Sequence, residues 1–145
     1  MIKVWDYIKE YEQIRDEVLE EIDGVFRRGT LVFGPKTEEF ENKFSDYCDS
    51  KYGIGVGNCT DALYVALKAF GIGEDDEVIT VSNTAVPTCT AIAMTGATPV
   101  FVEIDEYSLM DVSKIVDVIT NKTKAIIPVH MFGQMCDMDV INKIA

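Results

Sequence analysis

The order of apolar and polar positions predicts two amphipathic helices in the first third of the chain. The first is expected over about residues 5–26, with apolar residues at helical spacing at Trp5, Ile8, Val18, Ile22 and Phe26. The polar run EQIRDE interrupts this stripe, so one continuous helix and two shorter pieces both fit the pattern. A loop is expected over RRGTLVFGP, where two glycines and a proline fall close together. A short helix should follow over residues 36–48, where three aromatic side chains share one face.

From residue 52 onward, short apolar runs alternate regularly with amphipathic stretches. The runs predict strands at 52–56, 77–81, 98–104 and 124–132. The stretches predict helices at 60–70, 83–95, 109–119 and from 137 onward. The strand segments show no clean alternation of apolar and polar residues, which is typical of strands covered on both faces. Right-handed crossovers between such strands give an α/β fold with a mostly parallel, doubly wound sheet.

In open sheets of this kind, ligands bind beyond the carboxyl ends of the strands. Three segments therefore matter most: the turn at 57–60, the turn at 82–85, and the residues from His130 onward.

The turn Gly57-Asn58-Cys59-Thr60 leads directly into a predicted helix and has two interpretations. It is either a capped helix start with Thr60 as N-cap, or an anion site in which backbone amides and the Thr60 hydroxyl hold a phosphate. Asp61 would repel a dianion if it pointed at one, so we expect its carboxylate to turn back, either to cap the helix or to orient a neighbouring group. The turn lacks the G-x-G-x-x-G spacing of dinucleotide loops and the lysine of a P-loop.

The second turn and the histidine segment are also open to two interpretations. Asn83 or Thr84 is either a plain N-cap or a ligand contact, and Pro87 is acceptable only in the first helical turn. The chain's one histidine, His130, lies in the apolar run IIPVHMFG. It is either a structural residue or a residue near a site, and without a nearby partner it supports no catalytic triad.

Composition narrows the classes of function. The 145-residue length suits one domain, and a formal net charge of −12 argues against partners such as nucleic acid or an anionic membrane. No apolar run is long enough for a membrane span, and the N-terminus lacks a secretory signal, so we expect a cytoplasmic protein. The four cysteines show no metal-binding spacing, so we expect free thiols and no metal site.

Several motifs, in order, resemble the DegT–DnrJ–StrS family of pyridoxal-phosphate-dependent sugar aminotransferases. GTLVFGPKTEEFENKF is similar to the family's glycine-proline entry, and VGNCTDALYVAL is similar to its phosphate-binding turn. GATPVFVEID resembles a strand segment of the family, and KTKAIIPVHMFGQMCDMD resembles its proline-valine-histidine region. The resemblance covers nearly the whole chain.

This resemblance implies a fold and an activity. The fold is the three-layer αβα large domain of the aspartate-aminotransferase type (fold type I), here incomplete. Residues 1–36 form an N-terminal helical arm and loop, and residues 37–145 form part of the pyridoxal-phosphate (PLP) domain. The activity is transfer of an amino group from glutamate to a nucleotide-linked keto sugar, in polysaccharide or antibiotic-sugar biosynthesis, by a homodimer.

The resemblance also implies roles for individual residues. The cofactor-binding set is Asn58, Cys59, Thr60, Asp61, Thr84, Ala85 and Thr88. The loop near the substrate or the dimer partner contains Gly29, Thr30 and Gly34. His130 lies near the site.

Three departures from the family pattern qualify these expectations. Cys59 stands where the family usually has glycine, which matters only if that residue needs a positive φ. Ala85 stands where the family usually has an aromatic residue stacked on the cofactor ring. The aspartate and lysine that hold the cofactor would fall beyond residue 145, and Lys124 does not match that motif. We therefore expect this chain alone to be inactive. The alternative is a non-catalytic regulatory or interaction protein that retains the fold.

Overall fold

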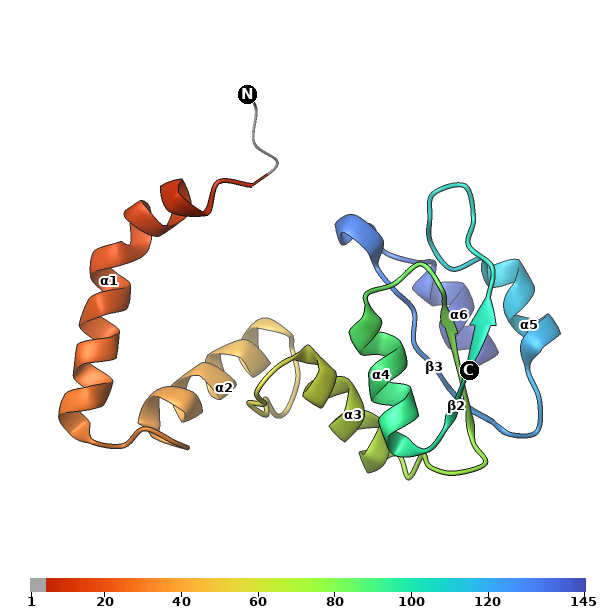
Figure 1. The fold of residues 1–145 in the computed structure, drawn as a ribbon, viewed down its shortest axis with the longest axis horizontal. Helices are drawn as coiled ribbons and strands as arrows, with labels where there is room; N and C mark the ends of the chain where they lie inside the picture. Colours follow the sequence, from red (N-terminus) through yellow and green to blue (C-terminus); the bar gives the residue numbers. More distant parts are fainter. Residues whose placement is uncertain (1–4) are drawn as a thin grey trace. The chain divides into compact units, whose positions relative to one another are not determined.

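The structure is a computed structural model that describes residues 5–145, and it divides the chain into two compact units (Figure 1). One unit ends at Gly55 and the other begins at Val56. The first unit is helical, whereas the second contains a sheet with helices on both faces.

The N-terminal unit contains two helices, α1 (Tyr7–Arg28) and α2 (Pro35–Tyr47). The first helix is continuous, so the single-helix interpretation of the interrupted stripe is correct. It ends at Gly29, whose φ of 70° places it in the left-handed region and lets its amide bond to the carbonyls of Val25 and Phe26. The second helix begins with Pro35 in its first turn, where the missing N–H costs nothing.

The predicted strand at 52–56 is wrong, because these residues form no ladder with any strand that the structure describes. Their backbone bonds to a helix side chain instead: Gly55 N donates to Glu41 Oε1 at 2.6 Å. A Cβ at Gly53 would collide with the backbone carbonyl oxygen of Glu41. An apolar run becomes a strand only where a partner supplies the hydrogen bonds, and here α2 takes that place.

The C-terminal unit is built on a three-stranded parallel sheet. The central strand is β1 (Glu77–Val81), with β2 (Thr98–Val102) on one side and β3 (Thr123–Ile126) on the other. Ile79 pairs with Val100 of β2 and with Ile126 of β3. The predicted parallel, doubly wound arrangement is therefore confirmed.

Helices cover both faces of this sheet and make three layers (Figure 1). On one face, α3 (Cys59–Ala69) and α4 (Val86–Thr95) share a buried cluster with β1 through Leu67, Val78 and Ile92. On the other face lie the short helices α5 (Ile115–Val118) and α6 (Met138–Ile144). They close a second cluster made by Ile79, Val81, Val102, Leu109, Met110, Ile115, Cys136 and Ile141.

Four predicted elements are shorter than expected. The strand predicted over 98–104 ends at Val102, and the helix predicted over 83–95 begins only at Val86. The helix predicted over 109–119 is a 3₁₀ turn, η1 (Val112–Lys114), followed by α5. The Asp111 side chain accepts the Ser113 amide at 3.0 Å and so starts the helix only after residue 111. The strand predicted over 124–132 ends at Ile126; Ile127 still donates to Ile79 O, but Pro128 has no N–H to continue the ladder.

Candidate functional site

The start of α3 is organised by a reciprocal pair of hydrogen bonds. Asn58 is the N-cap, and its Oδ1 accepts the Asp61 amide at 3.0 Å. Asn58 Nδ2 in turn donates to Asp61 Oδ2 at 2.8 Å. The expectation that Thr60 is the N-cap is therefore wrong, because the helix already begins at Cys59. The expectation that the Asp61 carboxylate turns back is confirmed: it orients the Asn58 side chain and accepts no backbone amide of the helix itself in the described residues.

This cap leaves two amides of α3 available. The amides of Cys59 and Thr60 open the helix and donate to no acceptor in the part of the chain that the structure describes. The Thr60 hydroxyl is also without a hydrogen-bond partner among those residues. Cys59 is not among the residues with positive φ, so its side chain causes no backbone strain where the family has glycine. Two amides and a hydroxyl at a helix N-terminus match the donors that a phosphate needs, so these residues fit the phosphate of PLP.

The second turn connects β1 to α4 and differs from the expectation in its cap. The N-cap is Ala85, not Asn83 or Thr84. The Thr84 hydroxyl lies 2.8 Å from the Thr88 hydroxyl and is therefore paired with a side chain instead of capping an amide. Pro87 lies in the first helical turn, as predicted.

The surroundings of this turn combine a buried hydroxyl with an exposed methyl group. Thr88 is buried, with 7% of its surface exposed, while Ala85 is exposed at the helix start. The side-chain Nδ2 of Asn83 donates to Ser108 O at 3.4 Å and connects the turn to the loop after β2.

His130 lies beyond β3 and not inside a strand, which corrects the sequence-based placement. Its ring is exposed, and Nδ1 accepts the backbone amide of Cys136 at 3.2 Å. An imidazole nitrogen that accepts a hydrogen bond is unprotonated, so the proton of the neutral ring is assigned to Nε2. Cys136 is buried and its thiol donates to Val129 O at 3.3 Å.

The sheet topology brings these segments to one edge. Because β1 and β3 are parallel, the turn that follows β1 and the residues that follow β3 lie at the same carboxyl edge. Figure 1 shows α3 beside α4 and running in the same direction, so that both helices begin at this edge. The turn at 57–60, the turn at 82–85 and the residues that follow β3 therefore lie toward the same edge of the sheet. The first turn reaches this edge through α3 packing beside α4, and not through the predicted strand at 52–56.

The third predicted group belongs to the N-terminal unit. Gly29 and Thr30 are exposed, and Gly34 is buried. A Cβ at Gly34 would lie 3.0 Å from the carbonyl oxygen of Thr30, so glycine allows the loop to close tightly before α2.

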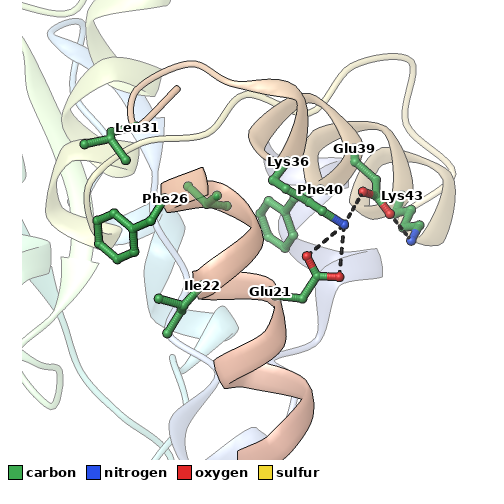
Figure 2. Close-up of a pocket in the computed structure, with 9 residues that line it drawn as sticks. Glu21, Ile22, Phe26, Leu31, Lys36, Glu39, Phe40 and Lys43 are labelled. Atoms are coloured by element: carbon green, nitrogen blue, oxygen red, sulfur yellow. Dashed lines mark hydrogen bonds and ion pairs between the residues drawn. The ribbon is translucent and has the colours of Figure 1, made fainter. Parts of the chain in front are cut away.

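A groove of about 730 Å³ lies between α1 and α2, and none of the predicted cofactor residues lines it (Figure 2). Its wall is apolar, with Ile22, Val25, Phe26, Leu31 and Phe40. It is a feature of the helical unit and not part of the sheet-edge site.

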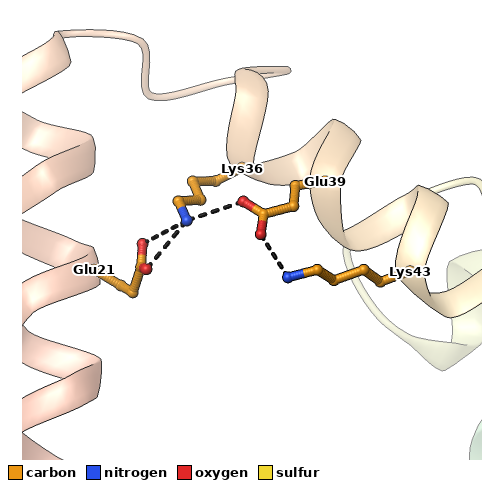
Figure 3. A network of polar contacts seen from close by, with 4 residues as sticks. All are labelled: Glu21, Lys36, Glu39 and Lys43. Carbon is orange, nitrogen blue, oxygen red and sulfur yellow. Dashed lines mark hydrogen bonds and ion pairs between the residues drawn. The ribbon is translucent and has the colours of Figure 1, made fainter.

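A chain of ion pairs borders this groove (Figure 3). Lys36 Nζ lies 2.9 Å from both Glu21 Oε2 and Glu39 Oε2, and Lys43 Nζ lies 2.6 Å from Glu39 Oε1. The hydrogen bonds from Lys43 and then Lys36 lower the pKa of Glu39 to about 2. The hydrogen bonds to Glu39 and Glu21 raise the pKa of Lys36.

Sequence reasoning missed the cap role of Asn58 and the pairing of Thr84 with Thr88. Asn58 had a signal, because an N-cap type three residues before an acid is the capping-box spacing. The Thr84–Thr88 pair had none, because Thr84 lies before α4 begins at Val86 and is outside the helical spacing that brings residues four apart together. The bond between His130 and Cys136 depends on the turn between them, which no local pattern predicts.

Residues 5–145 were also compared with the requirements of a membrane span, a metal site and a disulfide. None of the helices there is long and apolar enough to span a membrane. The same residues contain no group of three or more histidine, cysteine and acidic side chains placed to hold a metal ion. All four cysteines are free.

Comparison with known proteins identifies relatives over nearly the whole chain. The model of the DegT/DnrJ/EryC1/StrS aminotransferase family matches residues 12–145. The dTDP-3-amino-3,4,6-trideoxy-alpha-D-glucose transaminase of Micromonospora megalomicea subsp. nigra is 45% identical over 143 residues, which is 98% of this chain and 38% of that protein.

Solved structures agree with this match. The crystal structure of S. venezuelae DesV in complex with a ketimine intermediate superposes with a TM-score of 0.94 at 39% identity, over 97% of this chain and 38% of that one. NtdA from Bacillus subtilis, with bound cofactor PMP, superposes with a TM-score of 0.89 at 34% identity, over 92% of this chain and 31% of that one. The chain therefore has the fold of PLP aminotransferases and spans about two fifths of the length of the relatives it matches.

Proposed function

Because the chain belongs to the DegT/DnrJ/EryC1/StrS aminotransferase family, we propose that it forms the phosphate-binding part of a PLP enzyme. The reaction is transfer of an amino group from glutamate to a nucleotide-linked keto sugar, in the biosynthesis of a polysaccharide or an antibiotic sugar. Support comes from relatives that are nucleotide-sugar transaminases, such as the Micromonospora protein.

The observation that carries the proposal is the pair of unbonded amides at the start of α3. Cys59 N, Thr60 N and the Thr60 hydroxyl donate to the cofactor phosphate, and the helix dipole favours its negative charge. Asn58 holds the Asp61 carboxylate at 2.8 Å and so keeps a second negative charge from turning toward the phosphate. The chain needs no lysine or arginine at this position, which is consistent with its net charge of −12.

The second turn and His130 orient the cofactor ring. Thr84 and Thr88 form one hydroxyl pair beside it, and the exposed methyl group of Ala85 packs against its face without stacking. His130 presents Nε2–H at the same edge, because its Nδ1 is bonded to Cys136. When bound, PLP supplies the electron sink for the amino transfer, while these residues bind and orient it.

The proposal also includes the oligomeric state and the cellular location of the enzyme. The enzyme is a cytoplasmic homodimer, and the loop that contains Gly29, Thr30 and Gly34 lies near the substrate or the partner subunit. The tight closure of this loop at Gly34 supports a defined loop conformation.

A comparison of PLP with pyridoxal, which lacks the phosphate, tests the proposal directly. Ultraviolet–visible absorbance titration of the 145-residue chain should show saturable PLP binding, much weaker pyridoxal binding, and competition by inorganic phosphate. Equal affinity for PLP and pyridoxal would contradict a phosphate site at α3. Cys59→Gly should leave PLP binding unchanged, because only the amide of residue 59 is used.

A further inference from the structure

Phe132 combines an unfavourable backbone conformation with an exposed ring. Its φ and ψ are 55° and 26°, in the left-handed region, and 94% of its surface is exposed. Five described non-glycine residues have positive φ, and three of them are Asp or Ser, whose short polar side chains tolerate this region better. A bulky residue there costs free energy, and Phe132 recovers none of it by burial within the chain.

The surrounding hydrogen bonds hold Phe132 in this conformation. Before it, Met131 N donates to Val129 O at 3.0 Å, and after it, Gly133 N donates to His130 O at 3.2 Å. The turn is closed by the Cys136 amide on His130 Nδ1 and by the Cys136 thiol on Val129 O. Cys136 is buried in the core cluster, and Met131 packs against that cluster. The turn is therefore anchored on both sides while its central ring points away from the core.

The position of this turn relates it to the proposed site. It follows β3, and therefore lies at the carboxyl edge where the turn at 82–88 follows the neighbouring strand β1. The chain beyond β3 stays attached to β1 through Thr80 Oγ1, which donates to Ile127 O at 3.0 Å. Phe132 is thus an aromatic ring presented at the edge that holds the candidate cofactor residues.

We propose that Phe132 is a specificity-determining residue that packs its ring against the apolar C–H face of the substrate's sugar. This inference rests on the proposed function. Amino transfer occurs at a sugar carbon, so the sugar must lie next to the cofactor, whereas the base lies a diphosphate away. An uncharged aromatic ring contributes nothing to holding a diphosphate, but it suits the C–H groups of a sugar ring. Packing against the sugar recovers the free energy that the exposed ring and its backbone conformation cost.

Phe70 provides a control in the same unit. It is also aromatic and exposed (84%), but it lies at the C-terminal end of α3, away from the helix start that contains Cys59 and Thr60. Phe132→Asn places a residue that tolerates positive φ at position 132, so this variant should be folded and at least as stable as the parent. Phe132→Tyr keeps an aromatic ring.

The test measures the affinity of the PLP-loaded chain for dTDP-glucose and for dTDP by isothermal titration calorimetry. Phe132→Asn should weaken dTDP-glucose binding about three- to tenfold, the range expected for loss of one aromatic contact, and leave dTDP binding unchanged. Phe132→Tyr should restore dTDP-glucose binding, and Phe70→Asn should change neither affinity.

Each other result is decisive. An equal loss for dTDP and dTDP-glucose would mean that Phe132 contacts the nucleotide and would overturn the proposal. So would unchanged dTDP-glucose binding in Phe132→Asn, or a parent chain that binds PLP but does not bind dTDP-glucose. A parent chain that does not bind PLP in the absorbance titration would instead overturn the proposed function on which this inference rests.

Discussion

Asn58 and Asp61 hold each other in a reciprocal pair at the start of α3: Asn58 Oδ1 accepts the Asp61 amide at 3.0 Å, and Asp61 Oδ2 accepts Asn58 Nδ2 at 2.8 Å. The pair caps the helix and also fixes the direction of the one carboxylate in this turn. The amides of Cys59 and Thr60 have no acceptor among the described residues, while the Asp61 carboxylate is held by Asn58.

Replacing Asn58 with alanine should separate the effect of the helix cap on stability from the effect of the held Asp61 carboxylate on PLP binding. Loss of the cap should lower the free energy of unfolding by about 1 kcal/mol, measured by urea denaturation. The released Asp61 carboxylate should also weaken PLP binding. Asn121→Ala is the control, since Asn121 is exposed in a turn and makes no side-chain hydrogen bond in the described structure. If Asn58→Ala reduces stability but leaves PLP affinity intact, Asp61 does not need to be held away from the phosphate.

The Thr60 hydroxyl is expected to bind the phosphate directly. Thr60→Val keeps the shape of the side chain but removes the donor, and should weaken PLP binding about tenfold or more, as expected for a hydrogen bond to a charged group. Thr60→Ser should retain most of the affinity. The stability of the free chain should change little in either variant, because the hydroxyl has no partner in the described residues. A loss as large in Thr60→Ser as in Thr60→Val would assign the effect to packing.

The elements of the C-terminal unit were largely predictable because their signals are local. The apolar run of β1 is buried on both faces, and the Gly96 stop after α4 depends only on the residue type and its neighbours. The motif order around Asn58 and Thr60 also led to the correct family. Each of these three features depends on the types of a few residues that are adjacent in the sequence.

The predictions that the structure contradicts share one physical cause: the conformation there is set by contacts between residues far apart in the sequence. Residues 52–56 have strand composition, but Glu41 takes the Gly55 amide that a neighbouring strand would need. Leu109 and Met110 continue a helical pattern, yet they are buried in the sheet cluster ahead of the Asp111 cap. The hydrogen bond from Cys136 to His130 joins two residues whose proximity depends on a left-handed turn between them.

Gly96 should be far less tolerant of substitution than Gly73, although both lie at the same end of the C-terminal unit. Gly96 has a φ of 91°, and a Cβ there would lie 3.3 Å from Glu74 N. Gly96→Ala should therefore lower the free energy of unfolding by about 1–2 kcal/mol. Gly73→Ala should be nearly neutral, because the φ of Gly73 is not positive and the nearest atom to a Cβ there would be Thr95 O, 3.8 Å away. Equal melting temperatures for the two variants would contradict a left-handed helix end at residue 96.

The ion-pair chain Glu21–Lys36–Glu39–Lys43 should be visible as an unusually acidic carboxyl group. The pKa of Glu39 lies at about 2 instead of 4.5, chiefly because Lys43 and then Lys36 donate hydrogen bonds to its carboxylate. A carboxyl whose pKa is lowered by folding stabilises the folded state above its unfolded pKa. That contribution is lost as the pH falls from about 4.5 through about 2. The pKa of Lys36 is raised from 10.5 in the folded state, so its ion pairs contribute fully to folding stability below pH 10.5. This contribution to stability is lost as the pH rises through the folded-state pKa of Lys36.

Carboxyl titration by NMR checks this prediction for Glu39 itself. Lys43→Ala should return its pKa toward 4.5 by the larger step and Lys36→Ala by a smaller one, since Lys43 makes the stronger hydrogen bond. High salt should also raise the Glu39 pKa toward 4.5, because these side chains are exposed and salt screens their charges. Lys9→Ala, near the opposite end of α1 from Glu21, should leave the Glu39 titration unchanged. A Glu39 pKa near 4.5 in the parent chain would show that the two lysines do not hold the carboxylate in solution.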